Sequence, residues 1–138
     1  MRPARNEDAP LLLAWRNDPA TRAQSRRQHA LTWAELIDAP AGTRRETYVG
    51  LRAGVPVGSI RFDLAGGECE LSWTVAPEWR GRGIGRALIA AAVAAAPSMR
   101  LFAEIKPGNL ASRRIAGQAG FVLAGAHDGL EIWRLTKA

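Results

Sequence analysis

The sequence has little of the chemistry that staples small domains or anchors them in membranes. Cys69 is the only cysteine, and the two histidines are His29 and His127. A disulfide framework is therefore excluded, and a zinc site would need an unusual mixture of ligands. No apolar run approaches the roughly 20 residues that cross a bilayer, and the N-terminus lacks the apolar core of a signal peptide. These absences predict a cytoplasmic domain with no metal and no membrane partner.

The chain nevertheless has enough apolar material for one folded unit, and we expect residues 1–138 to form a single domain. Its 138 residues are 47% hydrophobic and 23% charged, a balance typical of globular chains. The net charge of +6 comes from 17 Arg and 2 Lys against 13 acids. Excess arginine favours an anionic partner, either nucleic acid, a nucleotide cofactor or a nucleotide-linked substrate, although a merely arginine-rich surface gives the same charge.

Periodicity and turn residues predict the element order ααβββαβαββ. Asp8 is expected to cap a first helix that ends before Asp18-Pro19, and Thr32 and Glu35 have capping-box spacing for a second. The crossover in the middle implies a parallel pair and the hairpins imply antiparallel pairs, so the class is α/β (α+β) with a mixed sheet. Helices are expected over 8–17, 32–38, 83–96 and 110–119, and strands over 46–52, 55–64, 68–75, 99–105, 121–126 and 130–135.

Residues 75–88 have the clearest chemical pattern: a strand ends, three alternating glycines follow and a helix begins. Glycines let successive backbone N–H groups converge on an anion, and the helix start adds unpaired N–H groups and a positive dipole end. Arg80, Arg82 and Arg86 add positive charge. The spacing fits neither the dinucleotide fingerprint nor a P-loop, and it favours pyrophosphate binding over a solvated turn.

The motif Arg80-x-x-Gly-x-Gly resembles the Arg/Gln-x-x-Gly-x-Gly/Ala signature of the GNAT superfamily of acetyl-CoA-dependent N-acetyltransferases. A second segment, Asn109-x-x-Ser followed by Gly120-Phe121, resembles the downstream motif of that family. The predicted element order also agrees over essentially the whole chain. The resemblance implies a transferase that uses acetyl-CoA as co-substrate, without a metal, acting on a small-molecule amine and commonly pairing as a homodimer.

The resemblance also assigns cofactor contacts. The thioester would lie in a V-shaped splay between the fourth and fifth strands of the family, here 68–75 and 99–105. The end of the first of these would pair by main chain with the pantetheine arm, and an N–H near Val75 would polarise the thioester carbonyl. Asn109 would bond the arm or cap the next helix. The implied cofactor-binding residues are Trp73, Thr74, Val75, Arg80, Gly81, Arg82, Gly83, Ile84, Gly85, Arg86, Asn109 and Ser112.

A catalytic base is needed because alkyl amines are mostly protonated at neutral pH. Alternation on the strand 68–75 puts Glu70 on one face with Ser72 and Thr74, opposite a core face, so Glu70 is the candidate base and Glu104 the second. An ordinary solvent-facing role for Glu70 is equally compatible. Many GNAT enzymes use a tyrosine to protonate the departing thiolate, but Ala116 stands at that position. Ser112 or water is then the candidate acid.

The N-terminal third is expected to form the acceptor side. The segments Trp15-Arg-Asn and 56–63 resemble the GNAT branch that acetylates nucleotide-linked amino sugars, such as the enzyme of the pseudaminic-acid pathway. Trp15 itself is expected in the core. The candidate substrate-binding residues are Arg16, Asn17, Arg61 and Asp63, and Arg22, Arg26 and Arg27 are candidates for a nucleotide's phosphates.

Two other functional classes compete with the enzyme. A CoA-binding sensor that has lost catalysis is favoured by Ala116, and other GNAT acceptors include protein N-termini, polyamines and antibiotics. A nucleic-acid-binding module is supported only by charge, because the arginines are spread along the chain and no stacking platform or nucleic-acid motif is present. We therefore expect no nucleic-acid partner.

Overall fold

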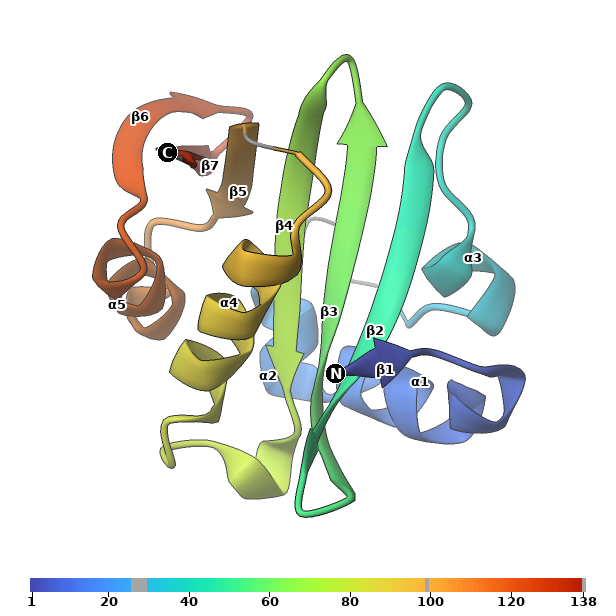
Figure 1. The fold of residues 1–138 in the computed structure, drawn as a ribbon. Helices are drawn as coiled ribbons and strands as arrows, with labels where there is room; N and C mark the ends of the chain where they lie inside the picture. Colours follow the sequence, from blue (N-terminus) through green and yellow to red (C-terminus); the bar gives the residue numbers. More distant parts are fainter. Residues whose placement is uncertain (26–29, 99, 138) are drawn as a thin grey trace.

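The structure is a computed structural model that describes residues 1–25, 30–98 and 100–137. Seven strands form one sheet in the order β1-β2-β3-β4-β5-β7-β6 (Figure 1). The strands are β1 (Arg2–Pro3), β2 (Arg44–Arg52), β3 (Val55–Ala65), β4 (Glu68–Val75), β5 (Arg100–Ile105), β6 (Val122–His127) and β7 (Leu130–Thr136). The helices are α1 (Ala9–Asn17), α2 (Pro19–Ala23), α3 (Trp33–Ile37), α4 (Ile84–Ala95) and α5 (Leu110–Gln118), with short 3-10 turns η1 (Asn6–Asp8) and η2 (Pro77–Trp79).

The sheet is mixed, as the sequence predicts. Among the described strands, only the β4–β5 pair is parallel, because α4 crosses between these two strands, whereas the other neighbouring pairs are antiparallel. Glycine turns at Ala53-Gly54 and Gly66-Gly67 have positive φ and join β2 to β3 and β3 to β4. β7 lies between β5 and β6, an order that the sequence does not disclose.

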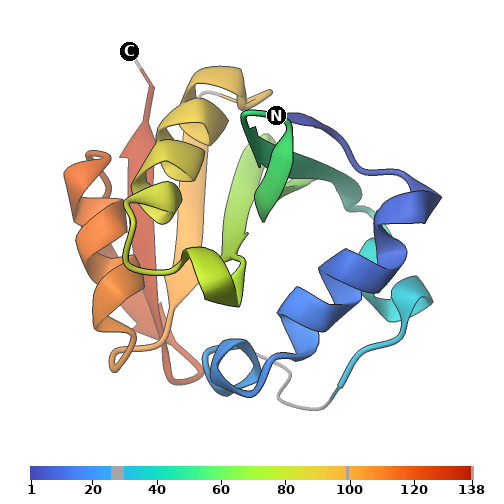
Figure 2. The ribbon, with the colours of Figure 1, turned by 90° about the horizontal axis from the view of Figure 1, so that it is seen from below.

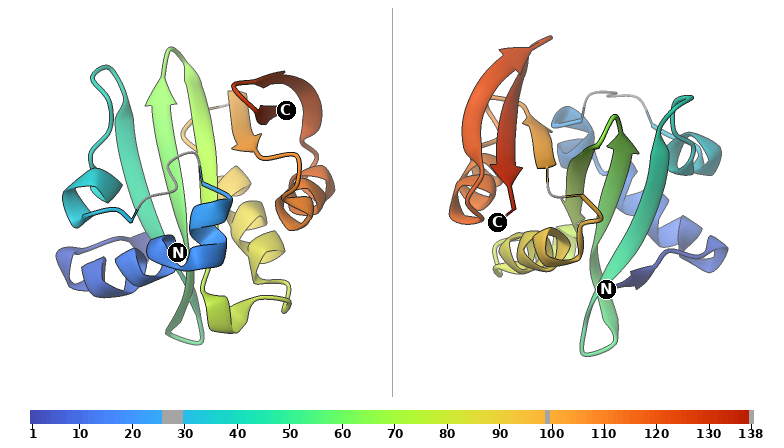
Figure 3. Two further views of the ribbon diagram at one scale, coloured as in Figure 1. Left: turned by 180° about the vertical axis from the view of Figure 1, so that it is seen from behind. Right: turned by 45° about the horizontal axis from the view of Figure 1, so that its top comes forward.

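The helices cover both faces of this sheet. In Figure 2, α4 and α5 lie on one face and α1, α2 and α3 on the other, and Figure 3 shows the second group from behind. The main core lies under α4 and α5 and includes Ile60, Leu71 and Ile89, all nearly inaccessible. A second, smaller core contains Trp15, at 3% exposure, on the buried side of α1 as predicted.

A pair of glycines brings α4 unusually close to the sheet. Gly50 on β2 is the register partner of Gly58 on β3, and Leu88 of α4 packs against both. A Cβ atom on Gly58 would stand 2.6 Å from Leu88 Cδ1 and 2.5 Å from the carbonyl oxygen of Thr74. No larger residue fits between these groups without a shift, so the two glycines set the depth at which α4 sits.

The N-terminal segment departs from the prediction in three ways. A short strand, β1, precedes the first helix, and Asp18-Pro19, which ends α1, also starts the further helix α2. Asp8 stands at the start of α1 but makes no capping hydrogen bond to it. Its carboxylate turns back to accept from both terminal nitrogens of Arg2, at 2.7 and 2.8 Å, and from the Arg5 N–H at 2.8 Å. The second predicted cap is confirmed, because Thr32 and Glu35 form the reciprocal capping box of α3.

Candidate active site

The site begins where β4 and β5 separate. The two strands pair only at Cys69 with Leu101 and at Glu70 with Phe102, near their starting ends. Beyond Glu70, the β4 edge that faces β5 makes no ladder contact with it among the described residues. The predicted splay is therefore confirmed, and we call this divergence the fork. Main-chain N–H and C=O groups along an unpaired edge can bond an extended ligand.

The loop after β4 has the backbone shape of an anion-binding nest. η2 follows the strand, and Gly81 and Gly83 then adopt φ of 73° and 76°, with open space around both α-carbons. Gly83 is the N-cap residue of α4, and its carbonyl oxygen accepts a hydrogen bond from the Ala87 N–H at 3.2 Å. The N–H groups of Ile84, Gly85 and Arg86 belong to the first turn of α4, where a helix has no acceptor of its own for them. This end of α4 therefore suits a pyrophosphate.

The three loop arginines differ in what they contact. Arg80 donates its backbone N–H to Pro77 C=O at 3.3 Å, so the nest begins at Gly81 rather than at Arg80 as expected. The Arg80 side chain reaches α2, as described below. The Arg82 guanidinium lies 5.0 Å from the ring centre of Trp79, a cation–π arrangement that keeps it beside the loop, and Arg86 is exposed.

The predicted alternation of β4 is confirmed. Cys69 and Leu71 are buried in the main core, at 0% and 1% exposure, and Trp73 and Val75 pack against it. Glu70, Ser72 and Thr74 are half-buried and line cavities on the face covered by α1 and α3. Glu70 lies at the closed end of the fork, directly beside Phe102 of β5. Glu104 lies further along β5 and is also half-buried.

The start of α5 places the other predicted groups. Asn109 Oδ1 accepts from the Ser112 N–H at 3.2 Å, so the capping role of Asn109 is confirmed and its role toward a cofactor stays a prediction. Ser112 is half-buried in the first turn of α5. Ala116 is fully buried in the main core, so the position where many family members carry a tyrosine is closed here.

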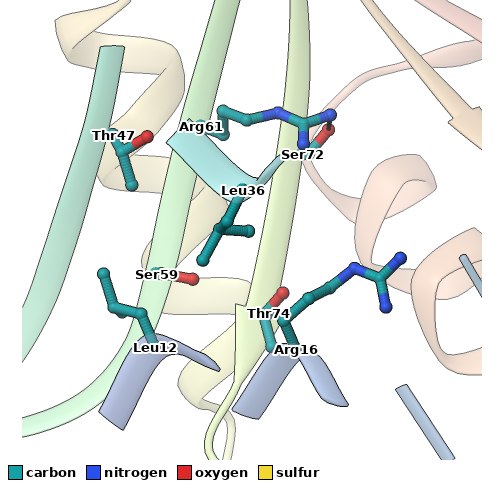
Figure 4. A pocket seen from close by; sticks show the side chains of 8 residues that line it. All are labelled: Leu12, Arg16, Leu36, Thr47, Ser59, Arg61, Ser72 and Thr74. Atoms are coloured by element: carbon teal, nitrogen blue, oxygen red, sulfur yellow. Dashed lines mark hydrogen bonds between the residues drawn. The ribbon is translucent and has the colours of Figure 1, made fainter. Parts of the chain in front are cut away.

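Two cavities open on the face of the sheet that carries Glu70. The smaller, about 60 Å³, is lined by Arg16 and Arg61 among hydroxyl groups, and Figure 4 shows the Arg61 guanidinium beside Ser72, while the Arg16 side chain passes Thr74 and its guanidinium extends beyond β4. Arg61 Nη2 donates to Ser72 Oγ at 3.3 Å. The smaller cavity is lined by Leu12, Arg16, Leu36, Thr47, Ser59, Arg61, Ser72 and Thr74. The larger, about 380 Å³, is lined by Pro40, Thr43, Arg45, Arg61, Asp63, Ala65, Glu68, Glu70 and Phe102.

Asn17, Arg61 and Asp63, three of the four predicted acceptor residues, have partners within the protein, and Arg61 Nε lies 3.4 Å from Asp63 Oδ2. Their roles toward an acceptor stay predictions. The Asn17 side-chain amide exchanges two hydrogen bonds with the backbone of Leu31, at 3.0 and 2.7 Å, and holds the segment before α3 against α1. Asp63 forms a two-pronged ion pair with Arg45, at 2.8 and 2.9 Å, in which both side chains are about nine-tenths buried. Arg45 in turn donates to the carbonyls at the end of α3, so this pair fixes α3 to the sheet.

Other residues at the site were not anticipated. Thr47 and Ser59 line the smaller cavity, and alternation along their strands would have found them, since both share a face with Ser72 or Thr74 through the register. Of the three arginines predicted to bind a nucleotide's phosphates, Arg22 lies half-buried on α2, whereas Arg26 and Arg27 lie outside the described residues.

Within residues 1–25, 30–98 and 100–137, no three His, Cys, Asp or Glu side chains gather as a metal site would require. No helix there has the length and apolar character to span a bilayer.

The fork and the glycine nest are the two features expected of a GNAT acetyltransferase, and comparison with known proteins gives the same family. Residues 1–122 match the family model described as the acetyltransferase (GNAT) domain, so the chain belongs to this family. Membership confirms the predicted class of acetyl-CoA-dependent N-acetyltransferase. No curated protein sequence matches the chain significantly.

Solved structures share the fold over nearly the whole chain. A ribosomal-protein-alanine N-acetyltransferase from Brucella melitensis is 28% identical, with a TM-score of 0.76, and the match covers 99% of this chain and 97% of that one. The yncA protein of Salmonella typhimurium, solved with its cofactor acetyl-CoA, is 22% identical (TM-score 0.76, 99% and 92% covered). The aminoglycoside acetyltransferase AAC(6')-Ib, solved with coenzyme A, is 18% identical (TM-score 0.79, 99% and 92% covered).

Proposed function

We propose that this protein transfers the acetyl group of acetyl-CoA to the amino group of a small acceptor that also carries an anionic group, with a nucleotide-linked amino sugar as the candidate. The observation that carries the proposal is the position of Arg16 and Arg61. Both side chains line the smaller cavity, on the face that carries Glu70, and Arg61 reaches the Ser72 hydroxyl. Guanidinium groups bind phosphate and carboxylate oxygens well, and an acceptor that carries only cationic groups has no such oxygens.

The residues present fit acetyl-CoA. The N–H groups from Gly81 to Arg86 would hold the pyrophosphate, with positive charge from Arg82 and Arg86 nearby. The edge of β4 at residues 73–75, which does not pair with β5, would bond the pantetheine arm, and Asn109 and Ser112 at the start of α5 would contact the same arm. Acetyl-CoA supplies an activated acyl group whose thiolate is a good leaving group.

The chemistry assigned to this chain is proton management around a direct attack. The acceptor nitrogen bonds to the carbonyl carbon, the carbon–sulfur bond breaks, and the sulfur leaves as thiolate. Glu70 takes the proton that the acceptor ammonium group must lose before its nitrogen can attack, directly or through water. The nitrogen gives up a second proton as the amide forms, and this proton reaches the departing thiolate through Ser112 or water, since Ala116 offers no donor. A main-chain N–H near Val75 stabilises the oxygen on which negative charge develops.

Cofactor binding is tested by titration calorimetry with acetyl-CoA, and with ATP for comparison. Gly83→Ala places a methyl group in the nest and should weaken acetyl-CoA binding at least about tenfold. Gly42→Ala is the matched control, because Gly42 also has positive φ (83°) and open surroundings but lies far from the nest in the chain. Equal affinities of the two variants, or no acetyl-CoA binding by the wild type, would contradict the proposed seat.

The acceptor class is tested by thiol release from acetyl-CoA with matched amines. An amino sugar should react more slowly than the same amino sugar linked to a nucleoside diphosphate, and Arg61→Gln should reduce the difference. A preference for polyamines or aminoglycosides, which carry only positive charge at neutral pH, would refute the anionic acceptor. Activity on a peptide beginning with alanine would favour a protein N-terminus as the acceptor; the Brucella melitensis structure is named for a ribosomal-protein alanine. Binding of acetyl-CoA without turnover on any amine would favour the sensor, which Ala116 supports.

A further inference from the structure

The short helix α2 is tied to both arms of the fork. At its start, Arg80 Nη2 donates to Asp18 Oδ2 at 2.9 Å and to Thr21 Oγ1 at 2.8 Å. At its end, Lys106 Nζ donates to the carbonyl oxygen of Ala23 at 2.6 Å. Arg80 belongs to the loop that follows β4, whereas Lys106 directly follows β5. α2 therefore spans the opening between the two strands on the acceptor side, and Figures 1 and 3 show it over the end of β4.

The contact with Arg80 uses only part of that side chain. Both bonds leave from Nη2, and the side chain is 41% exposed, so Nε and Nη1 offer further N–H donors for an anion. Asp18 is held in turn, because its Oδ2 also accepts from the Thr21 N–H at 3.3 Å as the N-cap of α2. The hydrogen bond from Arg80 lowers the pKa of Asp18, which therefore stays ionised at neutral pH. One guanidinium can thus bind α2 and a phosphate at the same time.

We propose that Asp18 and Thr21 are positioning residues for Arg80, and that through this contact acetyl-CoA binding steadies α2 across the fork. The inference rests on the proposed function, because it takes the glycine nest as the pyrophosphate seat. If contact with α2 favours the Arg80 geometry that binds phosphate, then phosphate binding must favour the contact with α2 by the same factor. Loading of acetyl-CoA would then complete the acceptor side, so acceptor affinity should rise once the cofactor is bound.

Asp18→Asn separates positioning from simple charge. Removing a carboxylate near a phosphate site should strengthen anion binding if only Coulomb attraction matters. Positioning predicts the opposite, a loss of acetyl-CoA affinity of about threefold to tenfold, because the amide holds the guanidinium more weakly. Thr21→Val, which leaves the Asp18 cap in place, should give a smaller loss in the same direction. Equal or tighter acetyl-CoA binding by both variants would overturn the positioning role.

Coupling to α2 is tested by hydrogen exchange of residues 19–25 with and without saturating acetyl-CoA. Exchange in the wild type should slow severalfold on binding, and Arg80→Gln should abolish this change. Arg82→Gln is the matched control, since it removes one positive charge from the same loop but contacts Trp79 rather than α2, and it should keep the change. If acetyl-CoA binds while α2 exchange stays constant, this inference fails and the proposed function stands. If the wild type does not bind acetyl-CoA, the proposed function itself fails.

Discussion

Replacing Gly58 with alanine should destabilise the protein through one specific collision. The new Cβ would meet Leu88 Cδ1 at 2.6 Å, which a leucine can relieve by moving the far end of its side chain, but also the Thr74 carbonyl oxygen at 2.5 Å. That oxygen belongs to β4 opposite β3, so it moves only if the pairing of the two strands shifts. Overpacking of this kind costs about 2–3 kcal/mol. For a chain of this size, Tm should fall by about 6–10 °C.

Thermal unfolding followed by circular dichroism measures this loss of stability. Acetyl-CoA titration measures the effect on the fork, since Thr74 lies on the part of β4 that does not pair with β5. Gly117→Ala is the control of opposite sign. Gly117 lies exposed in α5 with nothing within 4 Å of an added Cβ, so alanine there should stabilise the helix by about 0.5–1 kcal/mol. A Gly58→Ala protein that melts within a degree of the wild type would refute the argument that the glycine pair sets the depth of α4.

Three further predictions concern single side chains. The hydrogen bonds from Arg2 lower the pKa of Asp8 to about 2, below its usual 3.8, so the stability that this pair adds is present above pH 4 and is lost as pH falls toward 2. Asp8→Asn should therefore cost about 1–3 kcal/mol at pH 7 in a denaturant melt and have little effect at pH 2. Ala116→Tyr should lower Tm rather than supply an acid, because the site is fully buried; a variant with unchanged Tm and higher kcat would contradict this. Glu70→Gln should lower kcat mainly below pH 8, and a wild-type pH profile would exclude Glu70 as the base.

Local rules carried most of the fold. The strand 68–75 was predicted with the bounds it has, and the Thr32–Glu35 capping box was predicted from spacing alone. The sequence prediction lacks helix α2, although the chain carries a local signal for it. Asp at the N-cap followed by proline at the first helical position starts a helix as readily as it ends the preceding one. The position of β7 between β5 and β6 depends on pairing across the sheet, which no local pattern encodes.

The site follows the same rule: features set by near neighbours in the chain are predictable from the sequence, and contacts with distant residues are not. The glycine nest and the face that carries Glu70 depend on near neighbours in the chain and follow from spacing and alternation. The roles of Asn17, Asp63 and Arg80 depend on partners 14, 18 and 62 residues away. From its sequence neighbours alone, a polar side chain that binds a ligand cannot be told from one that bonds a distant part of the protein. The contacts of Asn17 and Asp63 that hold α3 and the segment before it in place are therefore not predictable from the sequence, and their roles toward an acceptor stay predictions.

The burial of Cys69 decides how turnover can be read. Each transfer releases one CoA thiol. The protein itself has one thiol, that of Cys69, which lies at 0% exposure in the main core, where burial raises its pKa to about 11. It is almost entirely protonated at assay pH and shielded from reagents, whereas thiolate is the reactive form. A disulfide reagent added during the reaction should therefore count CoA alone, with no slow background from the folded enzyme. A stoichiometric rise in that background would then report unfolding, so one optical trace can follow both catalysis and loss of the fold.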